Sequence, residues 1–442
     1  MENIIYEVIK ISRLYAIPTN RLTNECINSL SEEVNFVQNK IGQNIKMAVI
    51  DSSDSSIFNK NREAIIQAKE EFSLQEVYHI KKSIIDKICF DFVQKTNLDN
   101  KTHLISLLNS DELSYGMAAN RTFLLAAVLN CQYLHRRDSD VFINNRKENK
   151  SVPLPIEIEI NYLGNKCQDR NIKSHEGTIY MVGSGYLGDW AIDLMDMAKQ
   201  NFESFCDYIL VGKSGNTKEE VEKIVNDRFI QGYSEEYVKD EIYIPGRQNY
   251  IEVGNYSLYK IFLSLPLSPA IGTIGTDYFY HALMGNLGMP MVYHNRRLVH
   301  KHSKDRKDIK QLYDYHFRLV KHRCLVLYYS KLYKNVREKG VKIKGKNTLD
   351  TELIRDELID ISRHILYKEQ ENIIQKICEV YRNSNMKKYI NISEFIETKK
   401  MDIINSTHQD VYNHAMLINI WPQLIEFARE RGLEYITEGD YY

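Results

Sequence analysis

Residues 132–142, QYLHRRDSDVF, pass from a short apolar run into two arginines and then two aspartates. The run is typical of a buried strand. Asp138 and Asp140 are spaced i, i+2 after it, so both carboxylates can reach one hard cation such as Mg²⁺ or Mn²⁺. A simple turn is the alternative, because aspartate commonly forms turns after strands. Arg136 and Arg137 alternate faces on a strand, so at most one of them points toward a ligand at this edge.

The chain before this stretch predicts a parallel sheet. From about residue 11 to 143, short apolar runs alternate with segments of helical periodicity, which is the pattern of βαβ units. The expected strands are 12–21, 45–54, 75–80 and 131–142. The expected helices are 23–41, 62–72, 80–110 and 116–130.

Polar residues follow the predicted strands at their carboxyl ends, where a doubly wound sheet binds its ligand. Pro18, Thr19 and Arg21 end the first strand, and Asp51 ends the second. Each residue alone is more often a turn former or a helix cap. Because these residues and the aspartates after residue 137 all follow strands of one predicted sheet, we expect them to lie together at one ligand-binding edge of that sheet.

The chain after this stretch changes in character. Residues 157–166, 177–188 and 207–212 are expected to be strands, and residues 215–240 a charged helical insertion. Beyond about residue 305 nearly every segment has helical periodicity and few glycines, which predicts an α-helical C-terminal domain.

At this point the sequence resembles the GT-A class of nucleotide-sugar glycosyltransferases. The resemblance covers roughly residues 10–305 and depends on four motifs in order, none of them diagnostic alone. They are YAIPTNR (15–21), AVIDSSD (48–54), GMAANR (116–121) and the DxD motif in RRDSDV (136–141). It implies a GT-A-like, Rossmann-like mixed sheet flanked by helices over residues 1–305. The nucleotide half would be about 1–146 and the acceptor half about 147–305, followed by the helical domain 306–442.

The resemblance also implies roles for the strand-end residues. Asp51 would face the base of a nucleoside-diphosphate sugar, and Asp138 with Asp140 would hold Mn²⁺ or Mg²⁺, Asp138 also meeting the ribose. Arg21 and Arg121 would meet the phosphates or the ribose. The nucleotide loop and the helix start would add Pro18, Thr19 and Asn120 to the nucleotide-binding set.

A later stretch, SPAIGTIGTDYFYHALMGNLGMPMVYHNRRLVHKHSKDR (268–306), fits the same resemblance. Asp277 lies in a glycine-rich stretch before a helix, where such enzymes place an acidic residue near the acceptor. It would position or deprotonate the acceptor hydroxyl. His300 and His302 lie on one side of a predicted strand, so either is a candidate metal ligand.

A rival interpretation rests on Gly183, Gly185 and Gly188, which form G-x-G-x-x-G after a predicted strand. This pattern is typical of dinucleotide-binding sites. The next predicted strand lacks the acid that meets a ribose 2′-hydroxyl, although Lys213 after it would suit the 2′-phosphate of NADP. An NADP-dependent oxidoreductase therefore stays open as an alternative.

The same glycines have a second interpretation, as a turn at the mouth of an acceptor site. Gly185 would let Tyr186 and Trp190 approach the cleft, where an exposed aromatic ring would contact a sugar face or an apolar acceptor. Tryptophan in a helix is otherwise more often part of the core. The acceptor itself is not identified by any motif.

Composition restricts the remaining classes of function. The formal net charge of -1 gives no general attraction to nucleic acid or to membrane surfaces. The seven cysteines are scattered singly, which argues against disulfides and structural zinc. With no signal-peptide pattern and no long apolar run, we expect a cytoplasmic protein without a membrane span.

The leading hypothesis is a metal-dependent glycosyltransferase with a nucleoside-diphosphate sugar as donor. A nucleotidyltransferase on the same sheet and a non-catalytic sugar-binding protein remain as alternatives. The C-terminal helices are a candidate surface for a homodimer or for shaping the acceptor cleft.

Overall fold

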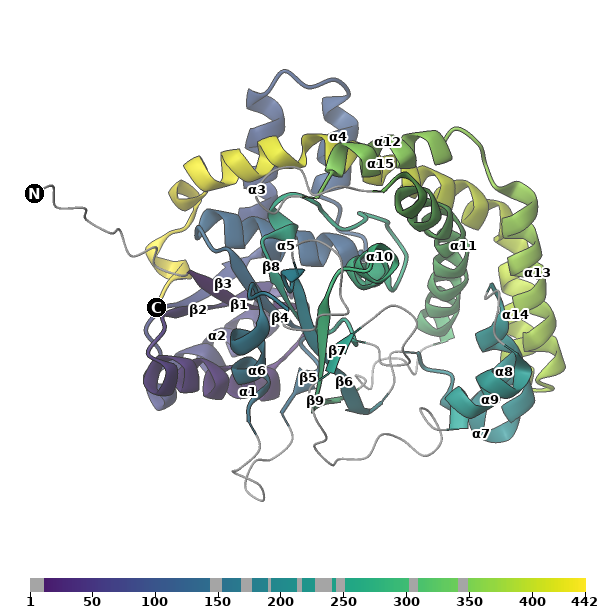
Figure 1. Cartoon of the computed structure of the whole chain (residues 1–442), viewed down its shortest axis with the longest axis horizontal. Coiled ribbons are helices and arrows are strands. Elements are labelled where there is room, and N and C mark those ends of the chain that lie inside the picture. Colours follow the sequence, from purple (N-terminus) through teal and green to yellow (C-terminus); the bar gives the residue numbers. More distant parts are fainter. Residues whose placement is uncertain are drawn as a thin grey trace, which may run out of the picture.

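A mixed β-sheet lies at the centre of the chain, with helices packed around it (Figure 1). The computed structural model describes residues 12–143, 153–167, 177–189, 192–212, 217–226, 241–243, 251–301, 309–340 and 349–442. Its sheet has the strand order β3-β2-β1-β4-β8-β6-β9-β5, with β7 also paired to β9. The strands are β1 (Arg13–Thr19), β2 (Ile45–Asp51), β3 (Val77–Lys81), β4 (Tyr133–Arg137), β5 (Val141–Phe142), β6 (Met181–Gly188), β7 (Glu241–Tyr243), β8 (Asn255–Tyr259) and β9 (Met291–His300).

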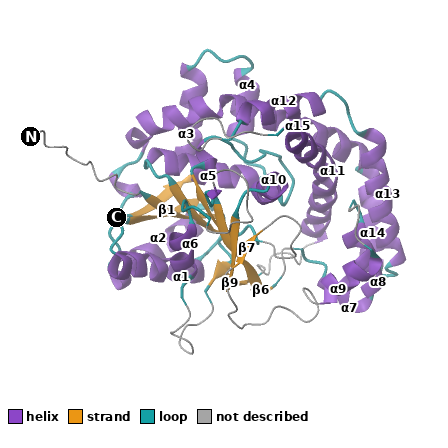
Figure 2. Cartoon of the chain, in the orientation of Figure 1, coloured by secondary structure: helices purple, strands orange, loops and turns teal. Residues whose placement is uncertain are grey.

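The sheet has a parallel half and a mixed half. Strands β3, β2, β1 and β4 run parallel, so their carboxyl ends meet at one edge. Strand β8 pairs antiparallel with both β4 and β6, while β6 and β9 are parallel to each other. Together with the helices on both faces, this confirms the predicted mixed sheet flanked by helices and followed by an α-helical C-terminal region (Figure 2).

The helices of the first half alternate with the parallel strands, as the hydrophobic pattern predicted. Alternate strand residues face opposite layers: Leu14 and Ala16 pack in the core with α3 and α5, whereas Tyr15 and Ile17 pack with α1 and α2. These helices are α1 (Asn24–Phe36) with its π-helical turn η1 (Val37–Ile41), α2 (Ser55–Phe72), α3 (Lys82–Lys95), α4 (Lys101–Leu108) and α5 (Tyr115–Val128).

Two predicted strands are helices. The predicted strand 157–166 begins with alternating Glu and Ile at 157–160, but α6 (Pro155–Tyr162) forms there. Pro155 lies in its first turn, where a missing N–H costs nothing. Residues 207–212 belong to the end of α8 (Phe202–Leu210) and the turn after it. Short apolar runs do not distinguish a strand from a buried helix, and packing decided both cases.

Three helices of the second half pack on the C-terminal helices. Helices α7 (Met195–Gln200), α8 and α9 (Lys218–Val225) share a core with α13 and α14, so the region of the predicted insertion packs on the C-terminal helices. Residues 227–240 of that insertion lie outside the described residues. The remaining elements are η5 (Ile261–Leu263), η6 (Thr276–Tyr278), α10 (Phe279–Leu287), α11 (Ile309–Lys339), α12 (Thr351–Ile361), α13 (Tyr367–Asn383), α14 (Lys387–Thr398), α15 (Lys400–Arg431), η8 (Gly432–Tyr435) and η9 (Glu438–Asp440).

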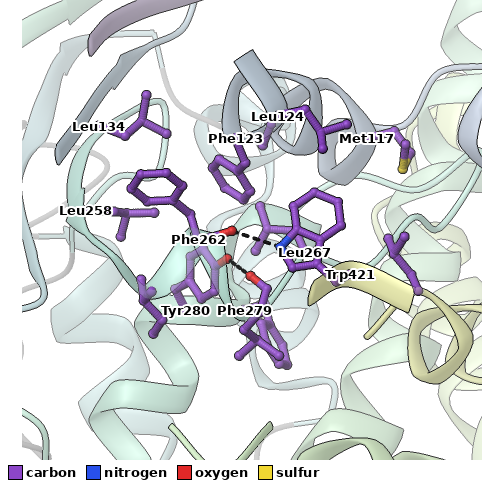
Figure 3. Close-up of a cluster of buried hydrophobic side chains, with 14 of the residues drawn as sticks. Met117, Phe123, Leu124, Leu134, Leu258, Phe262, Leu267, Phe279, Tyr280 and Trp421 are labelled. Atoms are coloured by element: carbon purple, nitrogen blue, oxygen red, sulfur yellow. Dashed lines mark hydrogen bonds between the residues drawn. The ribbon is translucent and has the colours of Figure 1, made fainter. Parts of the chain in front are cut away.

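The C-terminal helices pack directly on the sheet domain. Helix α15 runs along α3 and α5, and its Trp421 is fully buried in the same core as Phe123 and Phe262 (Figure 3). The indole Nε1 of Trp421 donates to the carbonyl oxygen of Phe262 at 3.0 Å. One continuous core therefore joins α15 to the central sheet.

Candidate active site

The Asp138–Asp140 turn lies at the carboxyl end of β4 and is held on both sides. The backbone N–H of Asp138 donates to Gly254 O at 2.8 Å, and Val141 N–H donates back to Asp138 O at 3.1 Å. From the start of α1, the Thr23 hydroxyl donates to Ser139 O at 2.8 Å. The turn is therefore fixed by backbone contacts, which leaves both carboxylates available to face the sheet edge.

His300 reaches this turn because β5 pairs with the end of β9. Val141 lies opposite His300 in that pair, which brings the imidazole Nε2 to 3.9 Å from Asp140 Oδ1. The other ring nitrogen, Nδ1, lies 2.6 Å from Asp189 O. A carbonyl only accepts, so Nδ1 carries the proton there, and in the neutral ring Nε2 presents a lone pair toward Asp140.

The two arginines of β4 point to opposite faces, as the strand geometry predicted. Arg136 donates to Asp138 Oδ1 at 2.6 Å, and its other terminal nitrogen lies 3.8 Å from Asp277 Oδ2. Arg137 donates instead to Glu33 and to Asn255 on the other face. Arg136 is therefore the arginine that belongs to the site.

Asp277, in η6, brings a further carboxylate close to Arg136. It is 3% exposed. Burial raises its pKa to about 7, with Asp138 adding to the rise, while Arg136 and the N–H groups of residues 277 and 278 oppose it. A carboxylate with a pKa near neutrality is suited to accept a proton at physiological pH.

Asp138 and Asp140 are close enough to repel each other. Burial is the main cause of the raised pKa of Asp138, and Asp140 adds to it, whereas Arg136, His300 and Arg21 act in the opposite direction. The side chain of Asp138 is 25% exposed and that of Asp140 21% exposed. Two neighbouring carboxylates with an imidazole beside them favour a bound cation.

Across the described part of the chain, no group of three or more His, Cys, Asp and Glu side chains forms a ready-made metal centre. The donors present nevertheless fit Mn²⁺ or Mg²⁺, since carboxylate oxygens suit both ions and the Nδ1 contact of His300 orients its Nε2. Asp138, Asp140 and His300 would hold the ion. The second predicted histidine, His302, lies outside the described residues.

Arg21 extends the cluster toward the first strand. Its guanidinium donates to Asp140 Oδ2 at 3.1 Å. Thr19, at the end of β1 after Pro18, bonds through its hydroxyl to the backbone of Arg21, donating to its carbonyl at 2.9 Å and accepting from its N–H at 3.2 Å. The first strand end thus presents one exposed cation beside the aspartates.

Asp51 lines a cleft of about 480 Å³ at the ends of β2 and β3, together with Phe58, Arg62 and Lys81. Burial would raise the pKa of Asp51, but hydrogen bonds from His79, Ser53 and Asn61 lower it, so this carboxyl is ionised.

Asn61 links this cleft to Arg21, which pairs with Asp140. Its amide donates to Asp51 Oδ2 at 2.8 Å and to Arg21 O at 3.0 Å. The sequence did not reveal Asn61, because it lies within α2 and its contacts depend on the fold.

Asn120 and Arg121 are not brought to the aspartates. Asn120 is fully buried and bonds to both backbone groups of Leu267, at 2.9 and 2.8 Å. Arg121 donates to Asp86 at 3.0 Å, and Asp86 lines the cleft beside Asp51. Arg121 therefore lies behind the wall of the cleft. Asn120 instead holds the backbone of Leu267, in the segment that leads to Asp277.

A group of residues missed in the sequence surrounds Tyr186. Its ring stacks on His300 with centroids 4.9 Å apart. A Cβ added to Gly254 would lie 1.8 Å from the Tyr186 hydroxyl oxygen and 2.7 Å from Asp138 Oδ2, so only glycine fits there. Glu252, two residues earlier, accepts from the Tyr278 hydroxyl at 2.5 Å.

The glycine fingerprint does not form the turn that dinucleotide binding requires. Gly183, Gly185 and Gly188 all lie within β6 rather than between a strand and a helix. Gly185 packs against the hydroxyl of Tyr293. Of the other residues involved in these interpretations, Trp190 and Lys213 lie outside the described residues.

Comparisons with known proteins identify a family without an assigned activity. A model described as "Family of unknown function (DUF6271)" matches residues 13–437. No curated protein sequence matches the chain. No helix among the described residues is long and apolar enough to cross a membrane.

Two solved structures show a weak likeness to this chain. A mycobacterial protein matches over 70% of this chain and 73% of its own, with a TM-score of 0.35 and 11% identity. Mannosyl-3-phosphoglycerate synthase from Rubrobacter xylanophilus matches over 75% of each chain, with a TM-score of 0.34 and 11% identity. At these scores the functional argument depends on the site geometry.

Proposed function

The chain belongs to the DUF6271 family, and for this member of it we propose metal-dependent transfer of a sugar from a nucleoside-diphosphate sugar to an acceptor hydroxyl. One observation carries the proposal. Asp138, Asp140, His300, Arg136 and Asp277 converge from three separate parts of the chain on the carboxyl edge of the parallel strands. Such an edge is where open α/β sheets bind nucleotides.

The donor would lie between the cleft at Asp51 and the aspartate turn. The ionised carboxyl of Asp51 suits hydrogen-bond donors of a nucleoside. The ring of Phe58, which stacks on the buried His79 with centroids 4.0 Å apart, lines the cleft beside it. Arg21, exposed beside Asp140, would contact the diphosphate. A Mn²⁺ or Mg²⁺ ion on Asp138, Asp140 and His300 would neutralise the charge that develops on the leaving diphosphate.

Asp277 would act on the acceptor. In an inverting reaction its carboxylate takes the proton of the attacking hydroxyl. In a retaining reaction it orients that hydroxyl instead. Arg136 holds the carboxylate and stays charged, because Asp138, Tyr256 and Asp277 raise its pKa against the opposing effect of burial. Tyr186, Tyr278 and Glu252 would line the acceptor side.

The test is calorimetric titration of the protein with a panel of nucleoside-diphosphate sugars, with and without Mn²⁺. We expect one donor to bind only with the metal, and Asp140→Ala to abolish that binding. Asp360→Ala is the matched control, since Asp360 is an exposed aspartate paired with Arg363 on α12. Binding of NADP(H) alone, or release of pyrophosphate from a nucleoside triphosphate, would contradict the proposal in favour of an oxidoreductase or a nucleotidyltransferase.

A further inference from the structure

A segment without helix or strand, residues 264–275, leads into Asp277. Residues 265–270 and Thr273 are buried, and the others are partly buried. Buried backbone groups need hydrogen-bond partners, and here side chains of α5, α10, α11 and α15 supply them. The contacts are Tyr280 to Leu265 O, His414 to Pro266 O, Asn120 to both backbone groups of Leu267, and Lys321 to Ile271 O. The C-terminal helices thus determine the path of this segment.

One buried ion pair holds a single residue of the segment. Lys321 of α11 donates to the carbonyl oxygen of Ile271 at 2.6 Å, and Asp410 of α15 pairs with Lys321. Lys321 Nζ and Asp410 Oδ2 are 2.8 Å apart, and their side chains are only 4% and 7% exposed. Burying two charges is costly, so a pair at this position needs a role beyond stability.

The neighbouring residue on α11 packs against the end of the segment. A Cβ added to Gly275 would lie only 2.8 Å from the ring of His322. Gly275 has φ +71°, a conformation that glycine adopts readily. The chain turns there and enters η6, which carries Asp277 to Arg136.

We propose that Lys321 and Asp410 are positioning residues: Asp410 fixes Lys321, Lys321 holds the carbonyl group of Ile271, and the pair so sets the Asp277 carboxylate beside Arg136 for the transfer step. The inference rests on the proposed function. It assigns the C-terminal helices an indirect part in the chemistry. Lys321 and Asp410 would act through the backbone of Ile271 and not through the aspartate turn. Misplacing a reacting group by about 1 Å costs on the order of 100-fold in rate.

The experiment compares the wild type with Asp410→Asn and with the double variant Lys321→Met/Asp410→Leu. Each is measured for kcat, donor KM and donor Kd by calorimetry. We expect kcat to fall at least about tenfold while donor KM and Kd change less than about twofold, because the donor contacts are elsewhere. The double variant replaces both charges with apolar groups, so it folds even if one unpaired charge prevents folding.

Glu357→Gln is the matched control. Glu357 is also a buried carboxylate of the C-terminal helices paired with a lysine of α11, Lys339, but it contacts no residue of the segment through that pair. We expect its kcat to stay within about twofold of the wild type. An unchanged kcat in the folded double variant, or an equal loss in Glu357→Gln, would overturn the inference.

Amide hydrogen exchange over residues 264–278 separates this inference from the proposed function. We expect faster exchange there in Asp410→Asn and in the double variant, and not in the control. If the wild type binds no donor, the proposed function fails while the exchange result still decides whether the pair holds the segment. Unchanged exchange in the variants would refute the positioning role directly.

Discussion

Arg136 and Arg137 are neighbours on β4, yet they belong to two very different charge clusters. Arg137 pairs with Glu33 on one face of the sheet, and neither side chain has any exposed surface. Arg136 pairs with Asp138 on the other face, where Asp138, Asp140 and Arg21 are partly exposed.

The buried charges around Arg137 and Glu33, called the inner cluster here, are satisfied by hydrogen bonds within the protein. Glu33 accepts from the Tyr15 hydroxyl at 3.0 Å and from Ile156 N–H at 2.9 Å, in addition to Arg137. Glu159 accepts from the buried His135 at 2.7 Å, and its pKa is lowered to about 2 because these contacts outweigh burial. The comparison teaches that neighbouring arginines of one strand belong to charge clusters of different exposure: the cluster of Arg137 is closed to solvent, and the cluster of Arg136 is open to it.

The largest expected effect on stability comes from breaking the inner cluster. Arg137→Met leaves Glu33 buried beside no cation, which should lower the free energy of unfolding by about 3–5 kcal/mol. Urea denaturation followed by circular dichroism measures it. The double variant Arg137→Met/Glu33→Leu should recover most of the loss, and a loss that persists there would show that the charge pair is not the cause.

Gly254→Ala should have the next largest effect, because the new Cβ would overlap the Tyr186 hydroxyl. We expect a loss of about 1–3 kcal/mol in the free energy of unfolding, together with weaker donor binding, since Gly254 also holds Asp138. At Gly439 an added Cβ meets no atom closer than 3.7 Å, so Gly439→Ala is the control. Adding Tyr186→Phe to Gly254→Ala should restore part of the stability; no recovery would argue against the overlap.

Asp277→Asn should stabilise the protein at pH 8 while reducing activity about 10²–10⁴-fold. Asp277 has its pKa raised from 3.8 to about 7, so the folded wild type loses stability as pH rises through this interval. Asparagine does not titrate, and we expect a gain of roughly 1–2 kcal/mol at pH 8 that disappears near pH 4. Urea denaturation at both pH values checks it; an equal effect at the two pH values would contradict the raised pKa.

The smallest change in stability is expected for Asp140→Asn. Its ion pair with Arg21 is partly exposed, and such pairs contribute less than about 1 kcal/mol. Donor binding in Mn²⁺ should nevertheless fall by at least about 100-fold, because a cation ligand is lost. Thermal unfolding and calorimetry on one preparation test both statements. A large loss of stability with donor binding intact would show that Asp140 has a structural role and is not a ligand of the cation.

The sequence predicted the parallel half of the sheet well, because β1, β2 and β4 are apolar runs with polar residues immediately after them. Proximity of Asp138, Asp140, Arg21 and His300 was also predictable, since each lies at or near a strand end. Glu252, Gly254 and Asn61 were not predictable, because nothing local distinguishes them and their contacts arise only when distant segments meet.

The errors have equally specific causes. Residues 157–162 alternate like a strand, but Pro155 starts a helix and Glu159 is needed by His135 on β4. Asn120 lies in a motif that resembles a nucleotide-binding segment, yet its amide is occupied by Leu267. In both cases a long-range polar contact outweighed the local pattern, which one sequence alone does not reveal.

The packing of α15 on the segment before Asp277 has a consequence for biosynthesis. Helix α15 begins at Lys400 and carries both Asp410 and Trp421, so these contacts form only after residue 421 has left the ribosome. Domains fold during synthesis from the N-terminal side. A nascent chain that stops before α15 therefore contains the strands and the aspartate turn but lacks the α15 contacts that support the segment before Asp277.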